Sequence, residues 1–291
     1  MDAFMTPLML NVEATETMPL LHAIVIGIVQ GLTEFLPISS TAHVKIVPVV
    51  MGWGDPGVTF TAIVQLGSIV AILGYFWSDV RQLLTGMWQA ITQQNYSAPD
   101  FRLGIGILIG TVPIVVFGLI IKFVLGEVYE SFGRSSVVIG ITSIGLAIFL
   151  GWAEVIGRRK RGYEDVGLWD GIGMGLAQAL ALIPGVSRSG STMTAGLFMG
   201  LNRETAARFS LLMGIPALLI SGLAEFLEPL SPVSTSALIT GVIASAVSSY
   251  LAIYWLIRFL KSHTTWIFVF YRIGFGIAIL WAIASGSMQN I

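Results

Sequence analysis

The chain has 291 residues, of which 55% are hydrophobic and only 11% are charged, and its formal net charge is −1. Its mean hydropathy of +0.85 lies far above the usual balance of a soluble domain, so the composition predicts a polytopic membrane protein. A net charge near zero with a single short basic run, Arg158–Arg161, excludes a nucleic-acid-binding protein, and the absence of cysteine excludes disulfides and thiolate chemistry.

Six apolar runs are long enough to cross a hydrocarbon core about 30 Å thick, which requires about 20 residues in a helix. They lie near 58–77, 103–125, 135–154, 206–227, 236–257 and 264–285. The acidic segment from Met1 to about Pro19 has no basic start of a secretory signal and is expected to be a short lead-in outside the membrane. We therefore predict an all-α polytopic membrane protein that forms one membrane domain over 1–291.

Two further apolar stretches, 20–50 and 168–200, are each interrupted in the middle by prolines, glycines and a group of polar side chains. A charged side chain at bilayer depth costs about 3 kcal/mol on insertion scales, so it persists where it meets a partner, a substrate or water. The two stretches are therefore predicted to be broken helices, folded as re-entrant hairpins, that carry the functional site.

The two halves of the chain resemble each other. A shift of 148 residues places Gln30 on Gln178 and Ser40 on Arg188. Because repeats with interrupted helices recur in membrane proteins, we predict an ancient duplication. Its parts are repeat 1 over about 20–155, a cytoplasmic loop over about 156–166, and repeat 2 over about 167–286.

Three spans and one re-entrant hairpin in each half require that the two repeats are inverted relative to each other in the membrane. Basic residues favour the cytoplasmic side. When the loop over 156–166 is placed in the cytoplasm, other basic residues fall on the same side, namely Arg81, Arg102, Arg203, Arg208, Arg258 and Lys261. The first hairpin then enters from the outside and the second from the cytoplasm, so that their tips meet near the midplane.

The first interruption combines a carboxylate, hydroxyls and an imidazole. Gln30 and Glu34 are four residues apart, so they share one face of a helix that ends near Pro37. Beyond the proline, Ser40 and His43 are three residues apart at the expected start of a second helix. A serine beside a base that a third group orients is the arrangement of a nucleophilic enzyme, which makes these side chains candidates for catalysis.

The second interruption has the composition of a phosphate site. Pro184 and Gly185 predict a sharp bend, and the serine-rich segment 187–192 then leads into an apolar helix. Backbone N–H groups at a helix start attract anions, and the planar guanidinium of Arg188 can bind two phosphate oxygens at once. The alternative is that Arg188 forms a buried structural ion pair with Glu34 while the hydroxyls only cap the helix.

The two motifs together resemble a known family. Q-x-x-x-E-F-L-P-x-S-S-x-x-H over 30–43, followed by P-G-x-S-R-S-G-x-T over 184–192, is similar to the bacterial undecaprenyl-diphosphate phosphatase family associated with bacitracin resistance, and the resemblance covers essentially the whole chain. It implies hydrolysis of undecaprenyl diphosphate to the monophosphate at the outer, periplasmic face of the bacterial plasma (inner) membrane, which recycles a lipid carrier for peptidoglycan synthesis. It also implies six spanning helices, two re-entrant hairpins and a divalent cation, Mg²⁺ or Ca²⁺.

The resemblance also implies roles for individual residues. Glu34, Ser40 and His43 are the expected catalytic residues, with Ser40 as the nucleophile and Glu34 as a metal ligand. The expected substrate-binding residues are Gln30, Ser39, Ser187, Arg188, Ser189, Gly190 and Thr192. Gln30 stands where the family has glutamate or glutamine, and its amide cannot act as a base. The sequence leaves open whether His43 or Glu34 is the general base, and whether Glu34 holds a metal ion instead.

A lipid flippase or transporter is the alternative function, because inverted repeats with broken helices also occur in transporters. A membrane phosphatase of the phosphatidic-acid type is excluded, since the required histidine does not follow Ser187 and Arg188. The expected partners are a polyprenyl diphosphate and membrane lipids, and the sequence does not decide whether the chain forms a homodimer. Arg272, within the last span, has Glu154 or a lipid headgroup as candidate partners and is left without a role.

Overall fold

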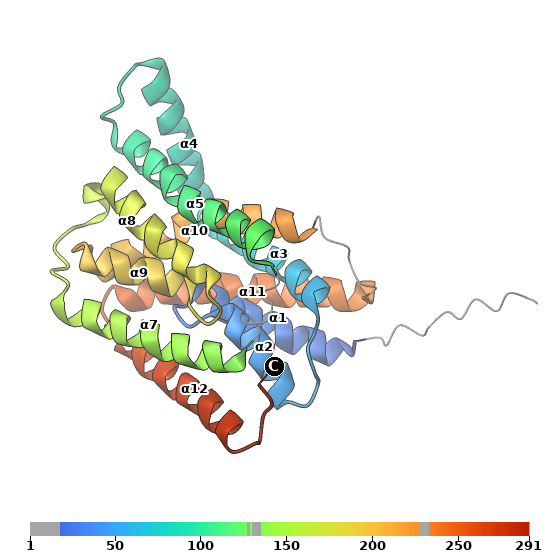
Figure 1. The fold of residues 1–291 in the computed structure, drawn as a ribbon. Coiled ribbons are helices and arrows are strands. Elements are labelled where there is room, and N and C mark those ends of the chain that lie inside the picture. Colours follow the sequence, from blue (N-terminus) through green and yellow to red (C-terminus); the bar gives the residue numbers. More distant parts are fainter. Residues whose placement is uncertain (1–17, 127–128, 130–134, 227–232, 291) are drawn as a thin grey trace, which may run out of the picture.

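The computed structural model describes residues 18–126, 129, 135–226 and 233–290, so the expected lead-in lies almost entirely outside the described residues. Within these ranges the chain is helical, and six helices are long and apolar enough to cross a membrane (Figure 1). These are α3 (Val58–Tyr75), α5 (Pro99–Val124), α7 (Ser136–Ile156), α10 (Arg203–Phe226), α11 (Thr235–Leu260) and α12 (Trp266–Ala284). They confirm the six predicted spans to within a few residues and indicate a multi-pass membrane protein.

Each interrupted stretch folds as a pair of short helices. The first pair is α1 (Leu20–Phe35) and α2 (Ser40–Val50), and the second is α8 (Leu168–Ala179) and α9 (Arg188–Phe198). The breaks contain Pro37 and Pro184, as predicted, because proline lacks an N–H group and clashes with the preceding helical turn. Each break also contains a residue with left-handed backbone, Ser39 with φ 77° and Gly185 with φ 85°, which turns the chain sharply.

The two ends of each helix pair lie close together. The ring of His22, at the start of α1, stacks on that of Trp53, which follows α2, with centroids 3.8 Å apart. Arg161, which precedes α8, exchanges backbone hydrogen bonds of 3.0 and 2.9 Å with Gly200 and Asn202, which follow α9. Each pair therefore turns back to the end of the molecule from which it starts.

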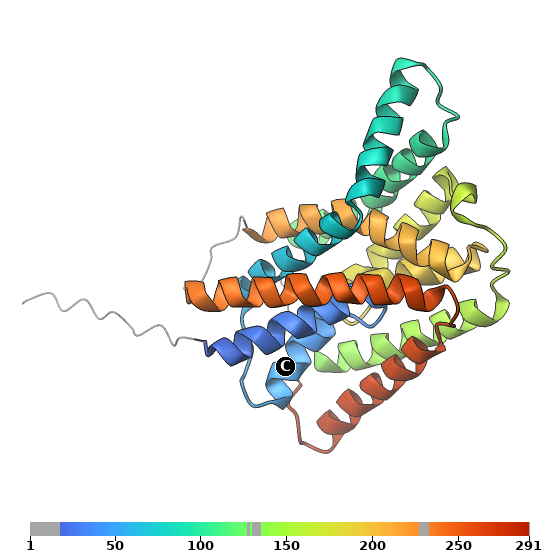
Figure 2. The same cartoon turned by 180° about the vertical axis from the view of Figure 1, so that it is seen from behind.

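The short helices pack against spans through glycine. α1 lies along α11, and α8 lies along α5 (Figure 2). A Cβ atom at Gly27 would come within 2.5 Å of the carbonyl oxygen of Gly241, and one at Gly175 would come within 2.3 Å of that of Gly110. Small residues allow such close approach of two backbones in membrane proteins, so these glycines fix the depth at which α1 and α8 sit.

Ion pairs gather at one end of the helix bundle. They are Arg159–Glu154, Arg203–Glu154, Arg161–Asp170, Arg208–Asp79 and Lys261–Glu204. Glu154 also accepts a hydrogen bond of 2.8 Å from the hydroxyl of Thr265, so both its oxygens are bound at the junction of α7, α10 and α12. Glu154 therefore does not pair with Arg272, and that candidate contact is wrong.

One helix has no counterpart in the sequence prediction. α4 (Trp77–Thr92) follows α3 and projects from the bundle together with the start of α5 (Figures 1 and 2). Ala90 is its single buried residue. Hydropathy and burial patterns detect helices that pack or cross the membrane, and α4 does neither along most of its length.

Candidate functional site

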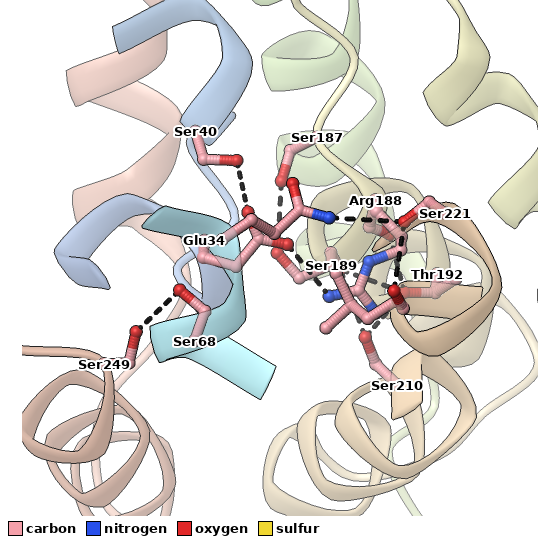
Figure 3. Close-up of polar contacts among 12 residues, drawn as sticks. Glu34, Ser40, Ser68, Ser187, Arg188, Ser189, Thr192, Ser210, Ser221 and Ser249 are labelled. Atoms are coloured by element: carbon pink, nitrogen blue, oxygen red, sulfur yellow. Dashed lines mark hydrogen bonds and ion pairs between the residues drawn. The ribbon is translucent and has the colours of Figure 1, made fainter. Parts of the chain in front are cut away.

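The carboxylate of Glu34 is the centre of the polar contacts at the first break. Its Oε2 atom accepts a hydrogen bond from Ser40 Oγ at 2.5 Å (Figure 3). The same atom accepts from Gln30 Nε2 at 3.0 Å. Gln30 and Glu34 share a face of α1, as their spacing predicted. The turn through Pro37 then brings Ser40, the first residue of α2, back beside Glu34.

Arg188 links the second break to the first. Its Nη2 atom lies 3.4 Å from Oε1 of Glu34, which is longer than the usual range for a charged hydrogen bond. Its Nη1 atom is buried over Gly214, where a Cβ atom would come within 1.5 Å, and it has no hydrogen-bond partner among the described residues. A buried donor without an acceptor is unfavourable, so the protein alone does not satisfy the hydrogen-bonding capacity of this guanidinium.

A cavity of about 430 Å³ opens beside these side chains. Its polar wall contains Glu34, Ser40 and Arg188. A largely apolar wall comes from α5 and α10, whose polar members there are Lys122 and Ser221 and whose apolar members include Ile114, Val115, Leu119, Ala217, Leu218 and Ile220. The cavity therefore suits a ligand that has one strongly polar end and one apolar end.

A second cavity of about 520 Å³ shares Ser40, Thr41 and Gln65 with the first. Its further lining mixes apolar residues with the polar side chains of Gln30, Lys45, Asp55 and Thr61. Ser40 therefore lines two cavities.

His43 does not contact Ser40. Its Nδ1 atom lies 2.7 Å from the carbonyl oxygen of Ser39, and because a carbonyl can only accept, Nδ1 must carry the proton. Its Nε2 atom then accepts from the hydroxyl of Tyr271 at 2.7 Å, and the ring stacks on Phe275 with centroids 4.2 Å apart. His43 lines neither cavity, so the structure does not place the imidazole beside the hydroxyl as the sequence suggested.

The second motif is divided between the cavity wall and the layer behind it. Ser187 and Arg188 line the cavity, whereas Ser189, Gly190 and Thr192 are buried. The polar groups of the buried residues already have protein partners. Gly190 N donates to Ser187 Oγ at 3.1 Å, and Ser189 Oγ donates to the Leu36 carbonyl at 3.0 Å. Thr192 Oγ1 bonds to Ser210 Oγ at 2.6 Å (Figure 3). These contacts fasten the start of α9 to the first break and to α10.

Sequence analysis missed Gln65, which lies in α3 and lines both cavities. Its Nε2 atom donates to Ser221 Oγ of α10 at 3.2 Å, across the cavity (Figure 3). The available signal was an isolated amide within an otherwise apolar span, where polar side chains usually face the protein interior or a cavity.

Within the described ranges, no three His, Cys, Asp or Glu side chains come together as a metal site. Glu34 is the single carboxylate among the described residues that line the first cavity, of about 430 Å³. Mg²⁺ is often held by one or two carboxylates together with substrate phosphates. Glu34 therefore fits a cation that the protein shares with a phosphorylated ligand, and does not fit a cage made by protein alone.

Known proteins resemble the chain along nearly its whole length. Residues 23–278 match the family model described as "Bacitracin resistance protein BacA". The undecaprenyl-diphosphatase of Trichormus variabilis is 55% identical over 279 residues, which cover 94% of this chain and 87% of the relative. That of Synechococcus elongatus is 52% identical over 288 residues, covering 98% and 100%. That of a Synechocystis species is 54% identical over 271 residues, covering 92% and 83%.

Proposed function

The chain belongs to the bacitracin resistance protein BacA family, and on this premise we propose that it is an undecaprenyl-diphosphatase, which hydrolyses undecaprenyl diphosphate to undecaprenyl phosphate and phosphate. The observation that carries the proposal is the Ser40–Glu34–Arg188 cluster at the polar end of a largely apolar cavity. The relatives are named for this hydrolysis, so the flippase alternative has no support. The released lipid phosphate is a carrier for cell-wall synthesis.

The cavity divides the substrate by polarity. The prenyl chain lies along the apolar wall of α5 and α10, where residues such as Leu119 and Leu218 replace lipid contacts. The diphosphate lies at the other end, where Arg188 lines the cavity and supplies a guanidinium fork that matches phosphate oxygens. Phosphoryl transfer depends mainly on positioning and charge stabilisation, so Arg188 is expected to matter as much as the nucleophile.

Ser40 attacks the terminal phosphorus in the first step. Its Oγ–P bond forms while the bond from that phosphorus to the bridging oxygen breaks, and undecaprenyl phosphate leaves. Glu34 takes the hydroxyl proton, because its Oε2 atom already accepts a 2.5 Å hydrogen bond from Ser40. Glu34 then passes this proton to the departing undecaprenyl phosphate. In the second step water attacks the phosphoserine with Glu34 as its base, the Ser40 Oγ–P bond breaks, Glu34 returns the proton to Ser40 Oγ, and orthophosphate leaves.

His43 acts on the nucleophile indirectly. Ser39 has left-handed backbone, a conformation that is unfavourable for a residue other than glycine and needs support from its surroundings. The 2.7 Å bond from His43 Nδ1 to the Ser39 carbonyl gives that support, and Tyr271 fixes the ring from its other side. His43 is therefore proposed to position Ser40, and Glu34 is proposed as the general base.

A divalent cation, Mg²⁺ or Ca²⁺, is proposed to bind between Glu34 and the diphosphate. When bound, it neutralises negative charge on the phosphate oxygens, which lowers the barrier to nucleophilic attack. Arg188 binds the same group from the second break, so the protein contributes one carboxylate and one guanidinium to a site that the substrate completes.

The two helix pairs are proposed to be re-entrant hairpins of an inverted repeat. In each pair, a residue at or before the start of the first helix contacts a residue just after the end of the second helix, which supports this proposal. His22 contacts Trp53 in the first pair, and Arg161 pairs with Leu201 in the second. Equivalent glycines also make equivalent contacts: Gly27 and Gly175 differ by the 148-residue shift, and both meet a glycine carbonyl of a span from the other half.

The hairpin α1–α2 is proposed to enter from the outer face of the bacterial inner membrane, and the site is proposed to open to that face. The ion pairs and the basic residues concentrate at the opposite end of the bundle, as expected for a cytoplasmic surface. The second cavity supports the same direction, because its lining includes Asp55 and Gly57 between α2 and α3, at the end where α1 starts.

The decisive experiment measures Mg²⁺- or Ca²⁺-dependent phosphate release from a C55 prenyl diphosphate by the purified protein in detergent. Ser40→Ala, Glu34→Gln and Arg188→Ala should each lower the rate by about 10²-fold or more, because each removes a group that acts on the transferred phosphoryl. Ser262→Ala, at an exposed site, is the control and should keep full activity. An unaltered protein that releases no phosphate, or a fully active Ser40→Ala variant, contradicts the proposal.

A further inference from the structure

Arg272 is a fully buried cation in α12 whose partners are backbone carbonyls. Its Nε atom donates to the carbonyl of Ser143 at 3.2 Å, Nη1 donates to that of Pro37 at 3.2 Å, and Nη2 donates to that of Gly185 at 2.8 Å. Pro37 belongs to the first helix break and Gly185 to the second. One guanidinium therefore holds both breaks while it is anchored to α7.

Carbonyls at a helix break need partners. They lack the hydrogen bond that an uninterrupted helix would supply, and water is scarce at membrane depth. Neighbouring carbonyls in the breaks take bonds from nearby side chains: Leu36 from Ser189 at 3.0 Å and Pro184 from Thr142 at 2.7 Å. Ser189 also connects the second break to the first, but through one hydroxyl, whereas Arg272 binds a carbonyl of each break with a single planar group.

The two carbonyls that Arg272 holds are equivalent in the internal repeat. Pro37 lies three residues before Ser40, and Gly185 lies three residues before Arg188. Pro37 and Gly185 are also separated by the same 148 residues that relate the two halves. If Arg272 only packed α12 against its neighbours, its two partners would not need to be equivalent positions of the repeat. Equivalent partners are expected if Arg272 aligns the two breaks.

We propose that Arg272 is a positioning residue that sets the spacing between Ser40 and Arg188. It does so because the two ends of a rigid, planar guanidinium each hold one break. The inference rests on the proposed function, in which Ser40 and Arg188 act on the same phosphoryl group. Arg272 lines neither cavity and touches no substrate in this arrangement.

Substitution by lysine separates geometry from charge. Lysine keeps the positive charge but presents a single nitrogen, which cannot hold the carbonyls of Pro37 and Gly185 at the separation that the fork sets. We expect Arg272→Lys and Arg272→Gln each to lower kcat by about 10²-fold, since a small misplacement of reacting groups has this effect. KM should change less than about threefold, because the apolar wall that binds the prenyl chain is intact. Arg258→Gln, which removes an exposed arginine of α11, is the control.

A double-mutant cycle excludes a merely structural role. Loss of folded protein would lower activity by the same factor in any background, whereas misalignment matters only while both aligned groups are present. In an Arg188→Ala background, Arg272→Lys should therefore lower kcat/KM by less than about threefold. An undiminished effect in that background, or near-normal kcat for Arg272→Lys alone, overturns the proposal.

Spin labelling tests the spacing without using activity. The chain has no cysteine, so two can be introduced at the exposed positions Thr41→Cys and Ile183→Cys, one beside each break, and labelled with nitroxides. Dipolar EPR should give a narrow distance distribution for the otherwise unaltered chain and a broader or displaced one with Arg272→Lys. An unchanged distribution refutes the positioning role. If the unaltered protein releases no phosphate, the proposed function is refuted. The EPR distance still tests whether Arg272 sets the spacing between the two breaks.

Discussion

Among the described residues, the Ser40 hydroxyl donates to the carboxylate of Glu34, at 2.5 Å. The other candidate base, His43, is bound on both ring nitrogens, to Ser39 and to Tyr271. At the scale of single residues, these contacts support the proposal that Glu34 is the base and that His43 shapes the turn before Ser40.

Asparagine can reproduce the donor of His43 but not its basicity. The side-chain amide N–H of His43→Asn can still reach the Ser39 carbonyl, so we expect kcat to fall less than about tenfold, whereas loss of a general base costs about 10²- to 10⁴-fold. Glu34→Gln should show that larger loss. Phosphate release at saturating lipid substrate measures both. Equal losses in the two variants would return the role of base to His43.

The sequence identified Glu34, Ser40 and Arg188 because a charge or a cluster of hydroxyls in an apolar stretch has few structural explanations. It could not identify the partner of His43, since Tyr271 lies 228 residues away and meets the ring only through tertiary packing. The left-handed backbone of Ser39, which sets where Ser40 and His43 point, also has no signal in a serine-rich segment.

Among the helices, those that cross the membrane could be predicted to within a few residues, because length and hydropathy alone define them. The breaks in the short helix pairs could be predicted from Pro37 and Pro184. The contact of α1 with α11 could not, although glycines at positions 27 and 175 marked the faces that pack most closely. α4 stayed undetected because it buries little apolar surface.

The close glycine contacts of α1 and α8 predict that substitution of Gly27 or Gly175 lowers the stability of the protein. Gly27→Ala and Gly175→Ala each place a methyl group within 2.5 Å of a backbone oxygen that cannot move aside, so each should destabilise the protein by about 1–3 kcal/mol. Gly145→Ala in α7 is the matched control, since nothing lies within 4 Å of its Cβ position. Thermal unfolding in detergent measures the difference. A melting temperature for Gly27→Ala equal to that of the control would contradict the tight packing of α1.

At the scale of the whole molecule, two helix pairs from opposite ends meet at one cluster of side chains. α1 of the first half is held by α11 of the second, and α8 of the second half is held by α5 of the first. This exchange means that neither half can form its part of the site alone. The sequence predicted the doubling and the orientation, but it gave no information on which helices the hairpins would pack against.

The proposed arrangement of the helices predicts which loops lie on the same side of the membrane. Single cysteines in the cysteine-free chain at Asp55→Cys and Ser236→Cys, both exposed, should react with a membrane-impermeant maleimide in intact spheroplasts. Exposed Ser97→Cys and Ser262→Cys should react only after the membrane is permeabilised. Labelling of Asp55→Cys on the same side as Ser97→Cys would mean that α3 does not cross the membrane.

The 3.4 Å contact between Arg188 and Glu34 also has a consequence for timing. In the proposed mechanism these two groups are the cation that binds phosphate and the carboxylate that removes the proton, and here each engages the other. A diphosphate that bound the guanidinium would weaken this contact and leave the carboxylate free to act on Ser40. The substrate would then activate the base that works on it.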